Sequence, residues 1–133
     1  MTVAEGMMRD DALSNVAGVV ELAVHLPWHS SLPLACVEGI SVQVDGSDAV
    51  DHDPVLRTVG RPEFRGRVSE AATCETTWDL RDPILVSLTI PPPDAGTTHD
   101  VAAEIACRIP YIVVGPGMPL VMRTRATAKV VVR

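Results

Sequence analysis

Apolar residues that recur at every second position constrain the fold of this chain more than any other feature. The longest such pattern covers residues 101–111, where Val101 and Ile105 point to one face and Glu104 and Arg108 to the other. A period of two is that of a β-strand with one buried face, whereas an amphipathic helix needs a period of 3.6. The same alternation occurs in four further segments: 20–26, 40–44, 84–90 and 122–132. The sequence therefore predicts an all-β fold.

Turn-forming residues separate these segments. Asp45-Gly46 is a hairpin signal, the three prolines 91–93 have no N–H to donate to a sheet, and Gly-Pro-Gly-Met-Pro occupies residues 115–119. Short connections favour antiparallel pairing, because parallel strands need long crossovers. We therefore expect a single-domain antiparallel β-sandwich over residues 16–133, jelly-roll-like, with six to eight strands. Residues 1–15 lack a period and are expected to form a loosely ordered N-terminal arm.

Two intermediate segments give weaker predictions. Residues 50–59 are compatible with a strand, but Pro54 interrupts them, which is typical of a sheet edge. Residues 60–75 read as a long connection with one short turn of helix.

Composition and charge exclude several classes of function. The 133 residues carry a formal net charge of −6, which disfavours contact with nucleic-acid phosphates, and four aromatic residues leave few platforms for base stacking. No apolar run approaches the roughly 20 residues that a membrane-spanning helix needs. We therefore expect no nucleic-acid partner and no membrane segment. The three cysteines form no CxxC motif, which predicts reduced thiols in a cytoplasmic protein.

Candidate metal ligands and nucleophiles do not form a convincing set. His25 and His29 lie four residues apart, but in an extended chain their rings would be roughly 13 Å apart, too far to share a metal ion. In Asp51-His52-Asp53 only the two aspartates can converge on one side of a strand, and a solvated turn is the simpler interpretation. Ser30 and Ser31 lack the GxSxG context of a nucleophilic serine. We therefore predict no catalytic residue and no metal ligand in this chain.

The segment from His25 to Leu34 is more informative, because Pro27 and Pro33 bracket Trp28. A tryptophan on a proline-stiffened loop can anchor an interface, since it buries a large area at little entropic cost. It can equally cap one end of the sandwich core. Trp78 has the same two interpretations, with core packing favoured. The basic stripe of Arg123, Arg125 and Lys129 is typical of a solvated strand face, and in an acidic protein it can also dock an acidic partner.

Several ordered stretches carry a resemblance to a known family. They are Val19–Leu26 leading into Pro27-Trp28-His29, Leu32-Pro33-Leu34, Val37–Gly46, Trp78 with Asp82-Pro83, Ile84–Ile90, and Val101–Ile109 leading into Pro110-Tyr111. In this order and spacing, over about residues 16–114, the chain resembles the small (β) subunit of bacterial C-glycoside deglycosidases. Where family members tend to have Tyr-Tyr-Arg-Gly, this chain has Trp28-His29-Ser30-Ser31, so the aromatic character is kept and the arginine is absent.

The resemblance implies a heteromeric carbon–carbon lyase that cleaves the sugar–aglycone bond of 3-oxo-C-glycosides by elimination. The family's α subunit is similar to sugar isomerases, a TIM-type barrel with a histidine base and a divalent metal, expected to be manganese. The β subunit is a sandwich without a cofactor of its own, which packs on the barrel and helps to close its active site. Trp28 and His29 are then candidates for contact with substrate or with the partner subunit.

Two other classes of function remain open from the residues. A stand-alone carbohydrate-binding sandwich would expose several aromatic platforms, and four aromatic residues leave few for that purpose. A structural adaptor would have no residue near any active site. The sequence does not distinguish a flavone, isoflavone or carminic-acid type of C-glycoside.

Overall fold

The computed structural model describes residues 6–59 and 63–133. Antiparallel strands dominate these ranges, which confirms the predicted all-β fold. The described part has eleven strands, more than the six to eight expected, because several contain only two residues. They are β1 (Leu13–Val16), β2 (Val19–Val24), β3 (Leu32–Pro33), β4 (Val37–Val44), β5 (Ser47–Asp48), β6 (Val55–Thr58), β7 (Arg65–Arg67), β8 (Thr77–Trp78), β9 (Ile84–Ser87), β10 (Thr98–Gly115) and β11 (Met118–Val131).

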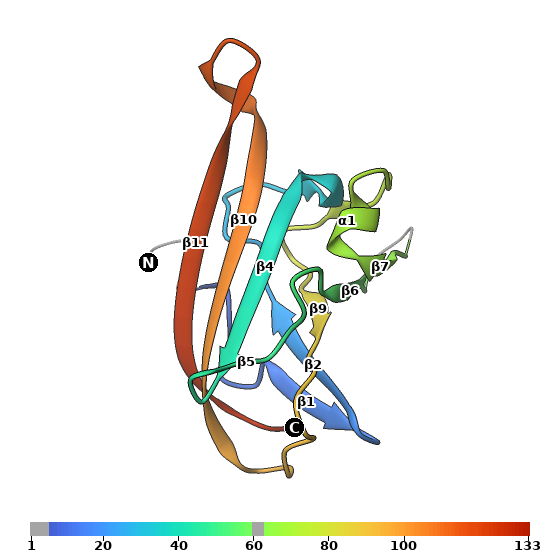
Figure 1. Cartoon of the computed structure of the whole chain (residues 1–133), viewed down its shortest axis with the longest axis vertical. Coiled ribbons are helices and arrows are strands. Elements are labelled where there is room, and N and C mark those ends of the chain that lie inside the picture. Colours follow the sequence, from blue (N-terminus) through green and yellow to red (C-terminus); the bar gives the residue numbers. More distant parts are fainter. Residues whose placement is uncertain (1–5, 60–62) are drawn as a thin grey trace.

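The strands form two main sheets with a core between them. One sheet has the order β1-β2-β9-β6-β7, and the other has the order β11-β10-β4-β5 (Figure 1). Leu22 and Val86 from the first sheet and Val42 and Ile105 from the second belong to one buried apolar cluster. Strands β3 and β8 form a separate small sheet. The jelly-roll-like connectivity stays a prediction.

Alternation along the strands determines which side chains face the core. In β2, Val20, Leu22 and Val24 are buried, while Glu21 and Ala23 between them are partly exposed. The same holds along β4 and along β10 as far as Ile109, so the inward-facing residues predicted from the period of two are confirmed there. Tyr111, the last residue of the predicted pattern, is exposed instead, because Pro110 interrupts the ladder before it. Asp45 and Gly46 have φ angles of 51° and 84°, which is the turn expected of an Asp-Gly hairpin.

The N-terminal segment contributes to the sandwich before residue 16. Met7 and Leu13 are completely buried, and β1 pairs with β2 through a tight turn. The backbone also ties this segment to the end of the chain, because Val131 N–H donates to the Asp10 carbonyl at 2.9 Å and Arg133 N–H to the Leu13 carbonyl at 3.0 Å. Residues 1–5 of the expected arm lie outside the described residues, so the division into an arm and a domain stays a prediction.

Strand β6 lies inside its sheet, between β9 and β7, so its expected place at a sheet edge is wrong. The physical reason is that Pro54 precedes the strand and removes no hydrogen bond from its ladder. The connection after β6 contains one short helix, α1 (Val68–Ala71), as the sequence predicts. A 3-10 turn, η2 (Leu34–Cys36), leads into β4. Neither helix is long or apolar enough to cross a membrane, and the described ranges contain no other candidate.

The β10–β11 hairpin extends far beyond the rest of its sheet. The last pair that links β10 to β4 is Cys107 with Val37, whereas β10 continues to pair with β11 as far as Gly115 and Met118. Residues 109–122 therefore form a two-stranded ribbon that projects past both sheets (Figure 1). We call this segment the hairpin ribbon.

Candidate functional site

The loop that carries Trp28 lies between β2 and β3 and is held against the turn after β8. Leu32 pairs with Trp78, and the Leu80 N–H donates to the Ser31 hydroxyl at 2.8 Å. Pro27 is buried, whereas His29 is exposed. We call residues 25–31 the proline-framed loop.

At the root of the hairpin ribbon, an irregularity in the strand pairing brings an aromatic side chain to this loop. Ile109 pairs with Leu120, and the next pair is Val113 with Pro119, so residues 110–112 bulge out of the ladder. Pro110 cannot donate a ladder hydrogen bond, which accounts for the break at this position.

The bulge places Tyr111 beside the proline-framed loop, where the indole Nε1–H of Trp28 donates to the Tyr111 hydroxyl at 2.5 Å. The ring centroids of Trp28 and His29 are 4.4 Å apart, with the planes tilted by 31°. Three aromatic side chains from two distant segments thus form one surface cluster, which we call the aromatic cluster.

Trp28 has features of both roles that the sequence left open. Its ring is half-buried and packs against the edge of the core, while its N–H points outward to Tyr111. Of the four aromatic residues in the chain, all of which the structure describes, Tyr111 alone is exposed. The sequence reasoning assigned no role to Tyr111. The signal that was available was the Pro110 that interrupts the longest alternating strand, directly before the tyrosine.

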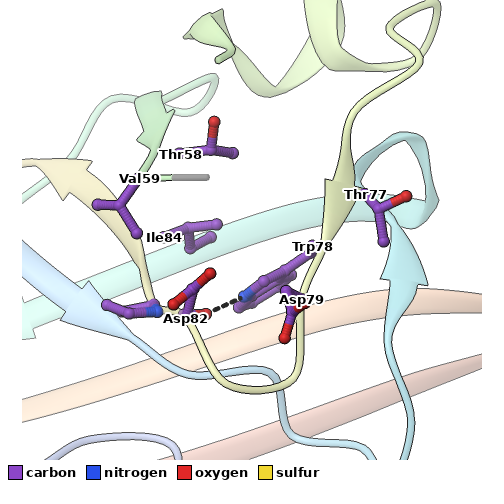
Figure 2. Close-up of a pocket in the computed structure, with 8 residues that line it drawn as sticks. Thr58, Val59, Thr77, Trp78, Asp79, Asp82 and Ile84 are labelled. Atoms are coloured by element: carbon purple, nitrogen blue, oxygen red, sulfur yellow. Dashed lines mark hydrogen bonds between the residues drawn. The ribbon is translucent and has the colours of Figure 1, made fainter. Parts of the chain in front are cut away.

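Trp78 is a core residue, as the sequence favoured. It is 2% exposed, and its indole N–H donates to the Asp82 carbonyl at 3.0 Å, which closes the turn after β8 (Figure 2). A pocket of about 130 Å³ lies beside it, lined partly by Thr58, Asp79 and Asp82. Cavities that bind small organic molecules are typically about 300–1,000 Å³, so this pocket does not accommodate a glycoside.

The carboxylate of Asp79 is engaged within its own turn. The Arg81 guanidinium and backbone N–H donate to it at 2.8–3.1 Å. The arginine side chain and then this N–H lower the pKa of Asp79 to about 2. Asp79 is therefore ionised at neutral pH and is not suited to act as a general acid.

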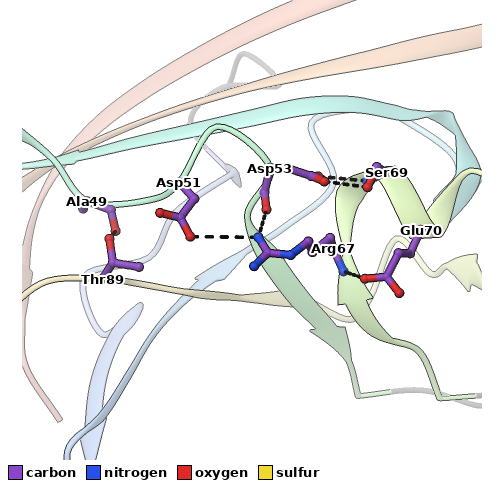
Figure 3. Close-up of polar contacts among 7 residues, drawn as sticks. All are labelled: Ala49, Asp51, Asp53, Arg67, Ser69, Glu70 and Thr89. Carbon is purple, nitrogen blue, oxygen red and sulfur yellow. Dashed lines mark hydrogen bonds and ion pairs between the residues drawn. The ribbon is translucent and has the colours of Figure 1, made fainter.

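The Asp51-His52-Asp53 motif has a structural role. Asp53 accepts hydrogen bonds from the Ser69 hydroxyl at 2.5 Å and the Ser69 N–H at 3.0 Å, and thereby holds the first turn of α1 (Figure 3). These bonds from Ser69 lower the pKa of Asp53. Arg67 donates to the Asp53 carbonyl at 2.7 Å and lies 3.9 Å from the Asp51 carboxylate. The Asp51 carboxylate thus faces Arg67 and the Asp53 carboxylate faces Ser69, so the two side chains do not share one partner.

Metal-ligating side chains are not grouped in residues 6–59 and 63–133. No set of three or more His, Cys, Asp or Glu residues there has an arrangement that would hold an ion. The absence of a cofactor from this chain stays a prediction. The basic stripe, Arg123, Arg125 and Lys129, is exposed on the outer face of its sheet, and Lys129 pairs with Asp100 at 3.2 Å. Its use for docking an acidic partner stays a prediction.

Known proteins with similar sequences indicate the family of this chain. No family model matches the chain. The 3'-dehydrocarminate deglycosidase beta subunit of a Microbacterium species is 32% identical over 117 residues, which span 87% of this chain and 84% of that protein. The C-glycoside deglycosidase beta subunit of Arthrobacter globiformis is 27% identical over 116 residues, which span 87% of each chain. Similarity over nearly the whole length of both proteins shows that this chain belongs to the family of C-glycoside deglycosidase beta subunits.

Proposed function

We propose that this chain is the β subunit of a heteromeric lyase that cleaves 3-oxo-C-glycosides, and that it helps to close the active site of an isomerase-like barrel subunit. The observation that carries the proposal is the aromatic cluster, which lies at the root of a projecting apolar ribbon in a member of a β-subunit family. The three free cysteines favour a reducing compartment, and we place the assembly in the cytoplasm.

The reaction is an elimination that a 3-keto group makes possible. A base removes the proton at sugar C2, which the neighbouring ketone acidifies, and an enolate forms. The enolate electrons then form a C1=C2 double bond and restore the ketone while the C1–aryl bond breaks. The electron pair of that bond goes to the aryl carbon, which is protonated as the aglycone leaves. A divalent metal in the barrel subunit, which we expect to be manganese, would stabilise the charge on the enolate oxygen.

The contribution of this chain is to form part of the wall of the reaction site and to exclude water from it. Trp28 and His29 present adjacent rings at the surface, and the hydrogen bond from Trp28 to Tyr111 fixes the indole in place. Flat rings of this kind suit contact with an aromatic aglycone, and they exclude water from a charged intermediate. No side chain of this chain is assigned the role of base or metal ligand.

A stand-alone carbohydrate-binding module is the alternative, and the exposure of the aromatic residues argues against it. Such modules use several exposed rings as sugar platforms, whereas of the four aromatic residues here Tyr111 alone is exposed, Trp78 is buried, and Trp28 and Phe64 are half-buried. Size-exclusion chromatography of the chain alone and with a co-expressed isomerase-like barrel subunit separates the two functions. Stable co-elution supports the lyase, and a monomer that ignores the barrel subunit supports the module.

The catalytic contribution is tested with Trp28→Ala and His29→Ala in the co-expressed complex, with turnover of a 3-oxo-C-glycoside as the readout. We expect both variants to assemble and kcat/KM to fall roughly tenfold or more, because the site loses part of its wall. Val19→Ala, an exposed residue on β2, is the matched control and should leave turnover unchanged. Unchanged assembly and turnover for both variants would remove the proposed role of the aromatic cluster.

A further inference from the structure

The hairpin ribbon has an unusual composition for a solvent-exposed segment. Residues 109–122 read IPYIVVGPGMPLVM and contain no charged side chain and no histidine, although 21% of the whole chain is charged. Arg108 and Arg123 flank this stretch on either side. The guanidinium of Arg108 is paired with the Glu38 carboxylate at 2.9 Å. The ribbon therefore offers neither charge nor alternation of polar and apolar residues to the solvent.

The ribbon carries exposed apolar side chains, although Ile109 is buried in the core and Ile112, Leu120 and Met122 pack against it. Five of the ten large hydrophobic residues that are exposed in the described ranges lie on it: Tyr111, Val113, Val114, Met118 and Val121. A strand that reads as a continuous apolar run is typical of burial on both faces. Contiguous exposed apolar residues, unlike single ones, mark a site of contact with another molecule. The sequence of the ribbon is therefore typical of a segment that is buried on both faces. In this chain, however, five of its large apolar side chains are exposed.

The ribbon also lacks support from its own sheet. β4 pairs with β10 only as far as Cys107, so beyond that residue two strands stand alone. A two-stranded ribbon is marginally stable in water unless another surface covers it. The ribbon is held at its root, where the Tyr111 hydroxyl accepts a hydrogen bond from Trp28. The same hydroxyl can donate a hydrogen bond to a further acceptor.

We infer that the hairpin ribbon is the docking arm of this subunit and that it inserts into an apolar, uncharged recess of the catalytic partner subunit. The inference rests on the proposed function. A second copy of this chain is a weaker occupant, because each copy carries a net charge of −6 and the two would repel one another. The family is also one of β subunits, whose names refer to a different partner chain.

The hydrogen bond between Trp28 and Tyr111 connects docking to the candidate site. Because Tyr111 lies at the root of the ribbon, insertion of the ribbon sets the position of the proline-framed loop relative to the partner. The recess must offer apolar side chains to the valines and an acceptor to Tyr111, and it must not leave an unpaired charge against them.

A single buried charge tests the inference. Val114 is 62% exposed in the chain alone, so Val114→Glu should fold normally, with an unchanged circular dichroism spectrum and an unchanged Tm. In titrations with the barrel subunit, we expect its Kd to be roughly a hundredfold weaker or more, since the carboxylate would be buried in an apolar recess. Met118→Lys, at another exposed position of the ribbon, should have the same effect with the opposite charge.

Val16→Glu is the matched control, because Val16 is 69% exposed and lies on the β1–β2 hairpin at the other end of the molecule (Figure 1). It should bind the barrel subunit like the unmodified chain.

If the unmodified chain binds and Val114→Glu and Met118→Lys bind equally well, the docking inference is overturned and the proposed function stands. If Val114→Glu only converts a dimer of this chain to monomer, a second copy is the occupant and the inference is again overturned. If the unmodified chain fails to bind the barrel subunit, the proposed function fails, and the inference fails with it.

Discussion

Burial determines the chemistry of the three cysteines. Cys36 and Cys107 are buried, whereas Cys74 is half-buried. Burial raises the pKa of the Cys107 thiol to about 12, with smaller contributions from Cys36 and Glu38. The thiolate is the reactive form of cysteine, so at pH 8 only about one Cys107 in 10⁴ is reactive at any moment.

We therefore predict that iodoacetamide at pH 8 modifies Cys74 in the native protein and leaves Cys107 unmodified. Peptide mass spectrometry at successive times measures the two rates, and labelling in urea should reach all three thiols. Native labelling of Cys107 at a rate comparable with that of Cys74 would contradict the burial of Cys107 in the core.

Asp45 gives a prediction about pH. The His99 ring, with Nδ1 2.7 Å from the Asp45 carboxylate, and then the Asp100 N–H lower the pKa of Asp45 below its ordinary 3.8. A lowered folded-state pKa contributes stability that is present above the ordinary value and is lost as the pH falls through the lowered one. Asp45→Asn keeps a residue that tolerates the turn's positive φ and removes the titration. Urea unfolding should show a lower free energy of unfolding for the variant than for the unmodified chain at pH 6. This difference should narrow below a pH of about 4. A difference in the free energy of unfolding that stays constant over this pH range would contradict the hydrogen bonds to the Asp45 carboxylate.

At the level of single elements, the turn between β1 and β2 is suboptimal for its conformation. Ala17 has a φ of 52° and Gly18 a φ of 84°, close to the angles of Asp45-Gly46. Non-glycine residues other than Asn and Asp pay roughly 1–2 kcal/mol in the left-handed region. Ala17→Asn should therefore stabilise the chain by about 0.5–1 kcal/mol in urea unfolding. Ala72→Asn is the control, because Ala72 is exposed with a φ of −57° and gains nothing from asparagine. An equal or lower stability of Ala17→Asn would contradict the assigned turn.

The strength of the local signals explains which elements the sequence predicted and which it did not. A period of two and an Asp-Gly turn sufficed for β4 and for the inward face of β10, because one local pattern specified both burial and connection. The β1–β2 hairpin was missed, since Ala17-Gly18 is not a strong turn signal and the burial of Met7 depends on contacts with distant strands. The two-residue strands β3 and β8 form through a pairing of Leu32 with Trp78 that no local pattern encodes.

The candidate site was predictable to a similar extent. Trp28 and His29 were identified from the proline-framed loop, and their function stays a prediction. Tyr111 was missed because its role depends on the bulge at Pro110, which brings together residues that lie 83 positions apart in the sequence. The alternation was expected to end at Tyr111, yet the strand continues to Gly115 through apolar residues that no longer alternate. Loss of alternation without loss of apolar character therefore marked a change of environment within the strand.

At the scale of the whole molecule, the two sheets pack around a common core, and the hairpin ribbon projects from it. The segment of β10 over residues 101–107 has neighbours on both sides, β4 and β11, and its inward side chains are buried in the common core. The hairpin ribbon, residues 109–122, shares the same two strands but lies beyond the last pairing with β4. Ile109, Ile112, Leu120 and Met122 pack into or against the core, whereas the side chains toward its tip are exposed. One continuous hairpin thus joins a segment of high local stability to one of low local stability.

This difference predicts a gradient of hydrogen exchange along a single hairpin. In the isolated chain, backbone amides of the ribbon should exchange at least about tenfold faster than those of residues 101–107, because opening a two-stranded end disturbs little buried surface. Addition of the partner subunit should slow exchange in the ribbon and leave residues 101–107 nearly unchanged. The β1–β2 hairpin serves as an internal reference, since the proposed docking does not cover it. Equal protection of ribbon and body in the isolated chain would mean that the ribbon is stable without a partner, and the physical reason for covering it would be lost.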